Sequence, residues 1–397
     1  MTKSYGNKFD EFQNEAVSAI TGEFEEKPYG RFLLVVPTGG GKTITAVKSI
    51  NELFDRGILD KTNDRVMWVA HRDYLCLQAK DSFSTFEKWY PERNSYKDSV
   101  DFVMIAEAPQ FLSDNSGVKL VVIDEAHHAA ANSYLPLFEK SDLGILGLTA
   151  TPTRHDGKPL DFEYEAYSIG FPDLIERGVV LRPTIRKIDT GLEYDDIHGF
   201  TKEDLDKLDD SARNQKIIDA IEANLDDYDK VVIYVGSVGH AKHLAKAIEQ
   251  SDLKDHYESI SYITGDGNSR GLPREDFLAV EKSWKRSIIV NVDVLTEGYD
   301  DPTVNTIVMA RPTRSKLVYM QAMGRSIRHD PDNAAKRSFV LEVVDGLPNI
   351  RYRIDNRWLY AEISDALEPA VEDRTYSNLE VLNETLGDIY DEFDVDE

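Results

Sequence analysis

The sequence predicts an α/β protein made of two tandem, doubly wound parallel-sheet domains, followed by a short acidic C-terminal helix or tail. Two observations support this fold class. Short apolar, β-branched runs alternate with stretches of helical spacing along most of the chain, which is the pattern of buried parallel strands joined by helices. The length of 397 residues is also sufficient for two to three domains of ordinary size.

The first part of the chain contains the first alternating array. Its predicted strands are the apolar runs 31–36, 65–70, 101–105, 119–124 and 143–149. The stretches 42–56 and 73–89 between these runs have the spacing and length of helices. We therefore expect one doubly wound domain over residues 1–170.

A connector and a second array follow. The stretch 153–183 mixes Pro, Gly, aromatic and charged residues without a sustained period, and we place the connector itself at 171–185. Predicted strands then resume at 231–235, 258–263, 287–292, 306–310 and 338–343, separated by helices that include 214–225 and 241–250. A second α/β domain is expected over 186–365.

Residues 366–397 form the predicted acidic amphipathic tail. Its apolar side chains recur at spacings of three and four residues, at Leu379, Leu382, Leu386, Ile389 and Phe393. This spacing predicts a helix with one apolar face. Three roles stay open for that helix: packing on the second domain, competition with nucleic acid through its carboxylates, or binding of a partner protein.

Composition limits the classes of function. Cys76 is the only cysteine, so an internal disulfide and a cysteine-based zinc site are excluded. The sequence contains no apolar run of membrane-spanning length and no signal peptide, so we expect a cytoplasmic protein without a membrane partner. The net charge of −26 disfavours a polyanionic partner in bulk, although it still permits weak, salt-sensitive binding at a local site.

A glycine-rich loop (residues 37–43) follows the first predicted strand and precedes a predicted helix. It consists of Pro37, Thr38, Gly39, Gly40, Gly41, Lys42 and Thr43. Glycines let successive backbone N–H groups turn toward phosphates, and the helix N-terminus adds partial positive charge. Lys42 would contact the β- and γ-phosphates and Thr43 would bind Mg²⁺. Val36 stands where the strict pattern has glycine; the alternative is a glycine-rich turn with a solvated lysine.

An acidic pair follows another predicted strand. The apolar run 120–123 ends in Asp124 and Glu125, and His127 follows. A carboxylate at the carboxyl end of a buried parallel strand suits a Mg²⁺ ligand, which fits Asp124, while Glu125 fits the base that polarises water. For His127 and His128 a hydrogen-bonding or core role is favoured over zinc ligation, because no further ligand cluster is present.

Five motifs occur in a recognisable order: 37–43, 124–127, 149–152, 296–300 and 321–328. This series resembles the superfamily 2 helicases, and in particular the DEAD/DEAH branch that contains type I restriction motor subunits and the XPB repair helicase. The resemblance spans roughly residues 9–345. It implies two RecA-like domains that close on ATP at their interface, with nucleic acid crossing both domains.

The resemblance also implies roles for matching residues. Gln13 resembles the adenine-sensing glutamine of the family, Thr149 and Thr151 resemble the motif that couples hydrolysis to nucleic-acid grip, and Asp300 resembles an acid that contacts the ribose or the domain interface. The full nucleotide-binding set is Gln13, Pro37, Thr38, Gly39, Gly40, Gly41, Lys42, Thr43, His127, Gly298, Asp300 and Gln321.

Two arginines complete the predicted catalytic set. Gln321, Arg325 and Arg328 are spaced i, i+4 and i+7, which predicts that they share one helical face. Two guanidinium groups in an acidic protein need a counter-charge, and the γ-phosphate held by the other domain would provide it. Arg325 and Arg328 would then stabilise charge in the transition state. The alternative is a salt-bridged surface.

Nucleic-acid contacts are predicted by the resemblance just beyond the carboxyl ends of strands. The candidates are His71, Arg72, Gln110, Ser237, Thr264 and Thr296. Phosphate contacts at such an edge need N–H groups, hydroxyls and a few cations rather than a basic surface. Ala108 stands where relatives often have threonine, so one contact is expected to be missing.

These features together predict a nucleic-acid-dependent ATPase that uses ATP and Mg²⁺ and acts as a helicase or translocase. DNA is the favoured substrate and RNA the alternative. Two other functions stay open: a motor subunit of a larger defence, repair or remodelling complex, and an ATP-switched clamp on nucleic acid that does not translocate.

Overall fold

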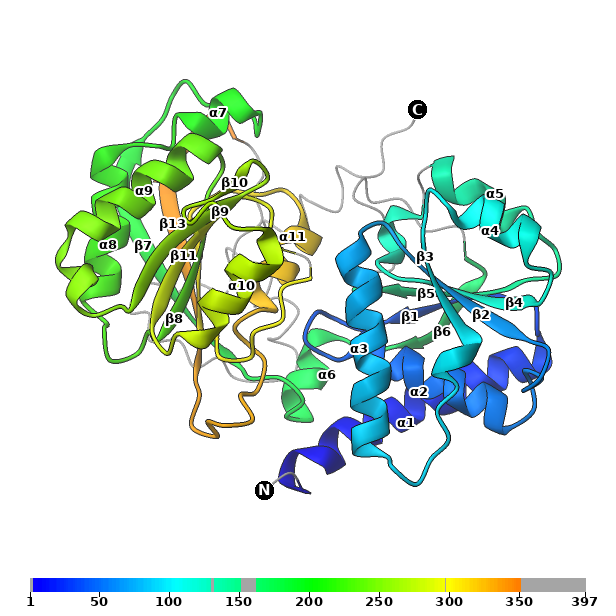
Figure 1. Cartoon of the computed structure of the whole chain (residues 1–397). Coiled ribbons are helices and arrows are strands. Elements are labelled where there is room, and N and C mark those ends of the chain that lie inside the picture. The colour runs from blue at the N-terminus through cyan, green and yellow to red at the C-terminus, as the bar shows by residue number, and fades with distance from the viewer. Residues whose placement is uncertain (1–2, 130–131, 151–161, 297, 351–397) are drawn as a thin grey trace, which may run out of the picture.

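The computed structural model describes residues 3–129, 132–150, 162–296 and 298–350. Figure 1 shows two α/β domains side by side, each built on one sheet. The last strand of the first sheet is β6 (Tyr164–Ser168), and the first strand of the second sheet is β7 (Pro183–Glu193). The predicted tail at 366–397 lies outside the described residues.

The first sheet has the strand order β3-β2-β4-β5-β1-β6, and all of its pairings are parallel. Its other strands are β1 (Arg31–Val35), β2 (Arg65–Ala70), β3 (Val100–Met104), β4 (Val118–Ile123) and β5 (Gly144–Thr149). Its helices include α1 (Lys3–Glu26), α2 (Lys42–Asp55), α3 (Asp73–Trp89), α4 (Ala108–Asp114) and α5 (Leu135–Phe138). The predicted parallel, doubly wound first domain is confirmed.

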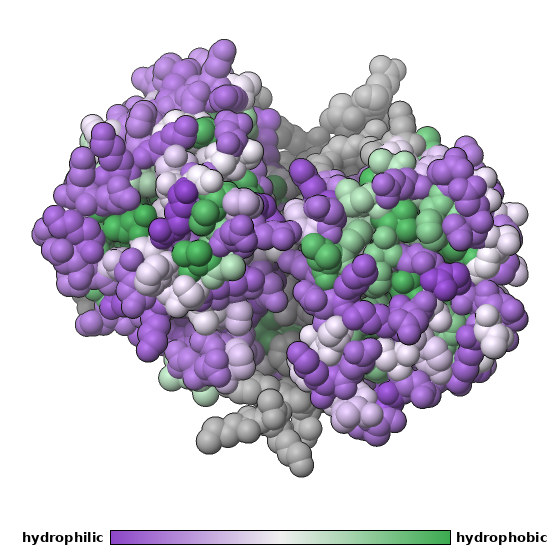
Figure 2. Space-filling view, viewed as in Figure 1, coloured by the Kyte–Doolittle hydropathy of each residue, from purple (hydrophilic) through white to green (hydrophobic). Residues whose placement is uncertain are grey.

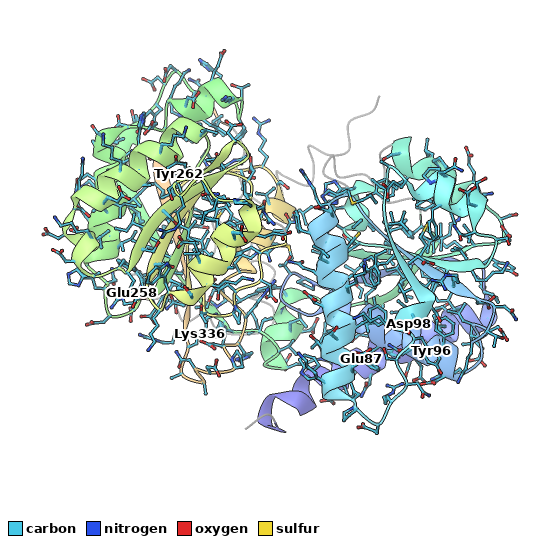
Figure 3. All side chains as sticks on the ribbon, in the orientation of Figure 1. Glu87, Tyr96, Asp98, Glu258, Tyr262 and Lys336 are labelled. Carbon is cyan, nitrogen blue, oxygen red and sulfur yellow. The ribbon has the colours of Figure 1, made fainter. Side chains whose placement is uncertain are left out.

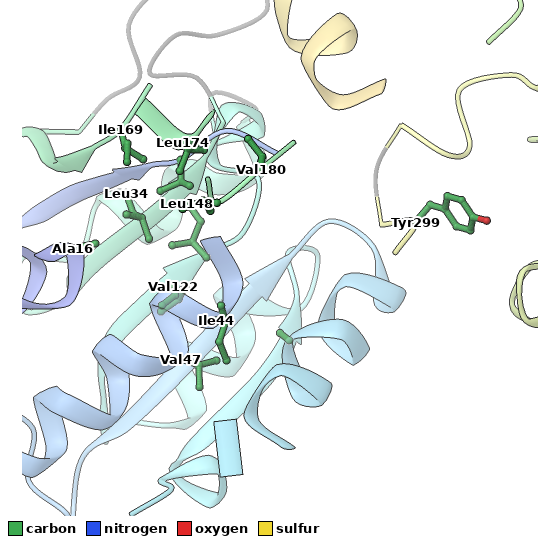
Figure 4. Close-up of a cluster of buried hydrophobic side chains, with 14 of the residues drawn as sticks. Ala16, Leu34, Ile44, Val47, Val122, Leu148, Ile169, Leu174, Val180 and Tyr299 are labelled. Atoms are coloured by element: carbon green, nitrogen blue, oxygen red, sulfur yellow. The ribbon is translucent and has the colours of Figure 1, made fainter. Parts of the chain in front are cut away.

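Alternate side chains of these strands pack into different cores. Leu34 and the other strand side chains on the same face of the sheet belong to a buried cluster with α1, α2 and α3. Leu33 and its counterparts pack instead with side chains of α4 and α5. Figure 4 shows strand residues Leu34, Val122 and Leu148 near the helix residue Ile44. Because successive side chains of a strand point to opposite faces, both faces of the sheet are covered by helices.

The second sheet has the order β10-β9-β11-β8-β12-β13-β7, and its pairings are parallel except for β10 with β9. Its remaining strands are β8 (Lys230–Tyr234), β9 (Ser259–Thr264), β10 (Gly267–Asn268), β11 (Ser287–Asn291), β12 (Thr306–Met309) and β13 (Ser338–Gly346). Its helices are α7 (Lys202–Asp206), α8 (Ser211–Glu222), α9 (Val238–Gln250), α10 (Arg274–Ser283) and α11 (Lys316–Met323). The second predicted α/β domain is also confirmed.

Part of the stretch predicted to be a connector is regular structure. β6 pairs in parallel with β1, and α6 (Phe171–Glu176) follows it. The prediction of an irregular stretch over 153–183 was therefore wrong for these residues. β6 is an edge strand with mostly exposed or half-exposed side chains, so it lacks the continuous apolar run that marks a buried strand.

Short 3₁₀ turns at Lys97–Ser99, Ala126–His128, Asn132–Tyr134 and Asp252–Asp255 complete the described elements. No helix in the described part of the chain is both long and apolar enough to cross a membrane. On the face seen in Figure 2, hydrophilic residues cover most of the surface, and hydrophobic residues gather mainly on the first domain.

Candidate functional site

The glycine-rich loop joins β1 to α2, which begins at Lys42. Gly39 and Gly41 have φ values of 93° and 83°, in the left-handed region that side chains avoid. Gly40 is tightly enclosed, because an added Cβ would lie 2.5 Å from Val36 Cγ1. The loop thus needs glycine at these positions, and its bends bring the main chain to the N-terminus of a 14-residue helix. A helix N-terminus of this kind is suited to phosphate.

Gln13 lies beside this loop on α1. Its side-chain Nε2 is 3.0 Å from the place that a Cβ on Gly41 would occupy. Gln13 is 1% exposed, and Nε2 has no hydrogen-bond partner among the described residues. A buried donor without a partner costs about 1–3 kcal/mol, so it marks a place where a ligand acceptor is expected. The residues present therefore fit a nucleotide whose phosphates lie at the loop and whose base lies near Gln13.

The acidic pair follows β4 directly. Asp124 Oδ1 accepts a hydrogen bond of 3.0 Å from the Glu125 backbone N–H. Glu125 has φ 50° and ψ 55°, a left-handed conformation that is costly for a residue with a side chain. Its Oε2 lies 3.3 Å from Nδ1 of the buried His127. Backbone strain of this type is concentrated at functional sites, where the surrounding structure maintains it.

Thr149 lies between the loop and the acidic pair. It ends β5, which is placed between β1 and β4 in the sheet. Its carbonyl oxygen accepts a hydrogen bond of 3.0 Å from the Val36 backbone N–H. Because parallel strands end at one edge of the sheet, Thr149 separates the loop from Asp124 at that edge. Thr151, the second predicted coupling residue, lies outside the described residues.

The second domain contacts the loop through residues 324–328, which we call the arginine segment. A Cβ on Gly324 would lie 2.6 Å from the Thr38 Cβ, and a Cβ on Gly39 would lie 3.6 Å from the Gly324 carbonyl oxygen. The same Cβ on Gly39 would lie 3.6 Å from Ile327 Cδ1. Gly324 is therefore required for the close approach of the two domains at this point.

The predicted common helical face of Gln321, Arg325 and Arg328 is wrong. α11 ends at Met323, with Gly324 as its C-cap, so only Gln321 is helical and both arginines lie in the turns that follow. The spacing of the sequence suits a continuing helix, but the chain bends where Gly324 meets Thr38. Gln321 is buried, and its Nε2 has no partner among the described residues.

Arg325 is buried within the second domain. Its guanidinium donates hydrogen bonds to the carbonyl oxygens of Tyr299, at 2.6 Å, and Thr296. Burial, reinforced by repulsion from Arg328, lowers the pKa of Arg325 to about 10. The charges of Asp300 and of Glu125 in the first domain act in the opposite direction. The arginine segment is therefore within electrostatic reach of the acidic pair.

Arg328 forms an ion pair with Asp300. Thus two predicted site residues contact each other within the second domain. The Nε atoms of Arg325 and Arg328 are buried and have no partner in the described part of the chain. The Nε–H of each guanidinium is thus left for a further acceptor.

The nucleic-acid candidates divide by exposure. Arg72 is exposed directly after β2, His71 is half-buried, and Gln110 is exposed. Gln110 is expected in the loop that follows the predicted strand 101–105, but it lies on α4, where it donates a hydrogen bond to Asp114 at 2.9 Å. The loop prediction was wrong because the helical stretch is only seven residues long and has no clear sequence period.

The three hydroxyl candidates are all buried. Thr264 ends β9, whereas Ser237 and Thr296 lie in the segments that follow the adjacent strands β8 and β11. Ser237 caps α9 by accepting the His240 N–H, and the Thr264 and Thr296 hydroxyls donate to nearby carbonyls at 3.1 and 2.9 Å. In this conformation their side chains stabilise the turns at the sheet edge.

One contact across the two domains was not predicted from the sequence. Gln78 on α3 donates a hydrogen bond to the carbonyl oxygen of Gly298. The guanidinium of Arg274 lies 4.1 Å from the ring centroid of Tyr74, also on α3. Tyr74 and Gln78 are four residues apart on one helix face, just after the predicted contact pair His71 and Arg72. That spacing is the signal that could have identified them.

Both domains match known family models. Residues 7–154 match the family described as "Type III restriction enzyme, res subunit", and residues 212–330 match "Helicase conserved C-terminal domain". These matches cover the glycine-rich loop, the acidic pair and the arginine segment in the order in which they occur along the chain.

Known proteins resemble the chain over most of its length. IRC3, a helicase-family protein of Saccharomyces cerevisiae, is 24% identical over 83% of this chain and 51% of its own length. The DNA 3'-5' translocase XPB2 of Sulfurisphaera tokodaii is 23% identical over 84% of this chain and 81% of its own. The chain thus spans only about half the length of the yeast relative.

A solved structure shares the fold. A fragment assigned to the HsdR subunit of a type I restriction enzyme from Vibrio vulnificus superposes with a TM-score of 0.60 at 20% identity. The superposition covers 83% of this chain and 63% of that fragment. The expected pair of RecA-like domains is thereby confirmed. This chain belongs to the superfamily 2 helicases, since it has both domains of that family and their motifs in the same order along the sequence.

Proposed function

We propose that the chain hydrolyses ATP between its two domains and uses the reaction to move along nucleic acid, as a DNA helicase or translocase. One observation carries this proposal: the arginine segment of the second domain packs against the glycine-rich loop of the first, through Gly324 and Thr38. Phosphates at the loop would therefore lie at the interface, where hydrolysis can change the contact between the domains.

The residues around the loop fit ATP and Mg²⁺. Lys42 would bind the phosphates, and Gln13 would donate to the base. Thr43 and Asp124 would hold the metal ion, which supplies charge neutralisation on the phosphates when bound. In the part of the chain that the structure describes, no group of three or more His, Cys, Asp or Glu side chains forms a metal site. This agrees with a metal ion that is held largely by the nucleotide and water.

Hydrolysis itself would depend on three side chains. Glu125 would orient and polarise the attacking water, and its Oε2 lies 3.3 Å from His127 Nδ1. Arg325 and Arg328 would stabilise the charge that develops on the transferred phosphoryl group. Arg328 would have to leave its pair with Asp300 to do so. This exchange of partners makes the hydrolysing state distinct from the state described here.

DNA is the proposed substrate because the relative XPB2 of Sulfurisphaera tokodaii is named as a DNA translocase. Arg72 and Gln110, which are exposed, are the proposed first contacts with the strand. The test is to measure ATP hydrolysis by the full chain alone and with single-stranded DNA, double-stranded DNA and RNA. We expect DNA to stimulate hydrolysis and added salt to reduce the stimulation. Hydrolysis that no polymer stimulates would contradict the motor function.

A strand-displacement assay and a triplex-displacement assay would then separate unwinding, translocation and clamping. A clamp would bind DNA in an ATP-dependent way without displacing either probe.

We also propose that residues 366–397 bind a partner protein, on the basis of their acidic, amphipathic sequence. Deletion of residues 378–397 should leave thermal stability and DNA-stimulated hydrolysis unchanged if that proposal holds. A loss of stability would instead indicate packing on the chain itself, and a higher basal ATPase rate would indicate competition with nucleic acid.

A further inference from the structure

Lys336 is a buried lysine whose ammonium contacts main-chain oxygens. It lies between the arginine segment and β13, and it is 7% exposed. Figure 3 labels it below the sheet of the second domain. Its Nζ donates hydrogen bonds of 2.6 Å to the carbonyl oxygen of Pro302 and 2.7 Å to that of Arg328. It forms no ion pair with any described residue.

The two carbonyls belong to the two segments that meet in the Arg328–Asp300 ion pair. Arg328 supplies one carbonyl itself, and Pro302 is two residues after Asp300. The neighbouring Asp301 is fixed independently, by Lys230 at 3.0 Å. The ammonium of Lys336 thus links the main chain of Arg328 to the loop that carries Asp300.

A lysine in this place is costly. Burial, together with the charge of Arg328, lowers the pKa of Lys336 to about 7, despite the opposing charges of Asp330 and Asp301. An apolar side chain would fill the space without that cost. A neutral amine still has two N–H groups, so Lys336 can donate a hydrogen bond to both carbonyl oxygens in either protonation state.

We propose that Lys336 is a positioning residue for ATP hydrolysis, which holds the main chain of Arg328 at a fixed place relative to the Asp300 loop. The proposal rests on the proposed function of the chain as an ATPase. With its main chain anchored, Arg328 can exchange Asp300 for the nucleotide by side-chain rotation alone. Without the anchor, the guanidinium would reach the phosphate from a variable position, and small displacements of a catalytic group cost much of its effect.

The first test is Lys336→Met, which keeps the length of the side chain and removes its donors. We expect kcat for ATP to fall about 10- to 100-fold, in line with the cost of misplacing a catalytic group, with KM nearly unchanged. Lys336→Arg retains donors for both carbonyls and should recover part of the rate. Lys336→Gln serves as the donor-poor variant if Lys336→Met fails to fold.

A double-mutant cycle separates positioning from general damage. If Lys336 acts through Arg328, Lys336→Met should have no further effect on kcat in the Arg328→Ala background. Lys230→Met is the matched control, since Lys230 is also buried and contacts the same loop at Asp301 but does not contact Arg328. Its effect should add to that of Arg328→Ala. Wild-type kcat in Lys336→Met, or an additive effect of Lys336→Met in the cycle, would overturn the proposal.

A second measurement needs no turnover. Lys336→Met should accelerate amide hydrogen exchange in peptides that cover 298–305 and 324–330, whereas Lys230→Met should affect the first peptide more than the second. A wild-type chain that does not hydrolyse ATP would contradict the proposed function, and the exchange data would still decide whether Lys336 holds the two segments together. Unchanged exchange in both peptides would reject that anchoring role.

Discussion

Gly298 of the second domain lies directly against the ring of Tyr74 in the first. A Cβ built on Gly298 would come within 1.9 Å of Tyr74 Cε2, and Gly298 also has a φ of 67°. The contact joins the 296–300 motif to the helix that follows His71 and Arg72. A methyl group at position 298 must therefore displace the Tyr74 ring, α3 or the 296–300 loop.

Gly298→Ala is expected to reduce ATP hydrolysis at least 10-fold by separating these two elements. Part of the effect is backbone strain, about 1–2 kcal/mol for a side chain in the left-handed region, and the rest is the overlap with Tyr74. Adding Tyr74→Ala removes only the overlap, so the double variant should recover part of the rate and of the melting temperature. Failure of Tyr74→Ala to relieve the defect would show that the ring is not the obstacle.

Lys42→Ala should abolish hydrolysis and weaken ATP binding, because the phosphates lose their point cation at the glycine-rich loop. Binding can be followed with a fluorescent ATP analogue and hydrolysis by phosphate release. Lys80→Ala, which changes an exposed lysine on α3, is the control and should bind ATP normally. Undiminished turnover in Lys42→Ala would reject the assignment of the loop.

Glu125→Gln should bind ATP and DNA but hydrolyse ATP about 10²- to 10⁴-fold more slowly, since the shape of the side chain is kept while water activation is lost. Single-turnover hydrolysis and DNA binding should be measured on the same preparation. Exposed Glu139 provides the control variant Glu139→Gln, for which both quantities should stay at wild-type values. Loss of ATP binding in Glu125→Gln would show a structural role for this carboxylate.

Arg328→Ala should lower kcat by about 10³-fold or more with a modest change in ATP affinity, because an arginine finger acts mainly as charge develops in the transition state. Arg328→Lys should fail as well, since an ammonium lacks the planar fork. Asp300→Asn tests the ion pair: it frees Arg328 and should not reproduce the loss of kcat. Altered affinity with normal kcat in Arg328→Ala would identify an ordinary binding residue.

His240 should make stability depend on pH. Burial, with repulsion from Arg213, lowers its pKa from 6.5 to about 3, and its Nε2 lies 2.8 Å from Asn214 Oδ1. Between these pH values the unfolded chain binds a proton that the folded chain does not, so the free energy of unfolding falls as pH decreases from 6.5.

Compared with His240→Gln, the wild type should therefore lose about 2 kcal/mol more stability on going from pH 7 to pH 5. Urea unfolding at both pH values provides the measurement. His256→Gln, at an exposed position, is the matched control and should keep the wild-type difference. Equal losses in wild type and His240→Gln would contradict the buried, neutral state of His240.

The buried parts of the fold were predictable because their signal is local. The run 65–70 and the helical stretch 73–89 coincide with β2 and α3, since β2 is a continuous buried run and α3 buries one face. β6 and β7 escaped prediction because edge strands bury less and alternate less clearly. Thr43 and Asp124 could be selected from local patterns alone, because Thr43 lies at the start of the helix after the glycine-rich loop and Asp124 directly follows β4.

The remaining site features depend on contacts distant in sequence. The bend after Met323 is set by Gly324 meeting Thr38 of the other domain, and no pattern within 321–328 records that contact. The burial of Ser237 and Thr264, and the anchoring of Arg328 by Lys336, likewise follow from tertiary packing. The spacing of the motifs in the sequence therefore identifies which side chains form the site. The positions of these side chains depend on contacts between the two folded domains.

The pairing of β7 with β13 has a consequence for synthesis of the chain. The first sheet is complete once Ser168 has been synthesised, whereas β7 can pair only after β13 has been synthesised. The hydrogen bond between Thr190 and Asp345 joins residues that are 155 positions apart in the sequence. The second domain should therefore fold late, after the first has formed. A nascent chain interrupted before Ser338 would leave β7 and β12 with unpaired edges, which makes such fragments prone to aggregation and to capture by chaperones.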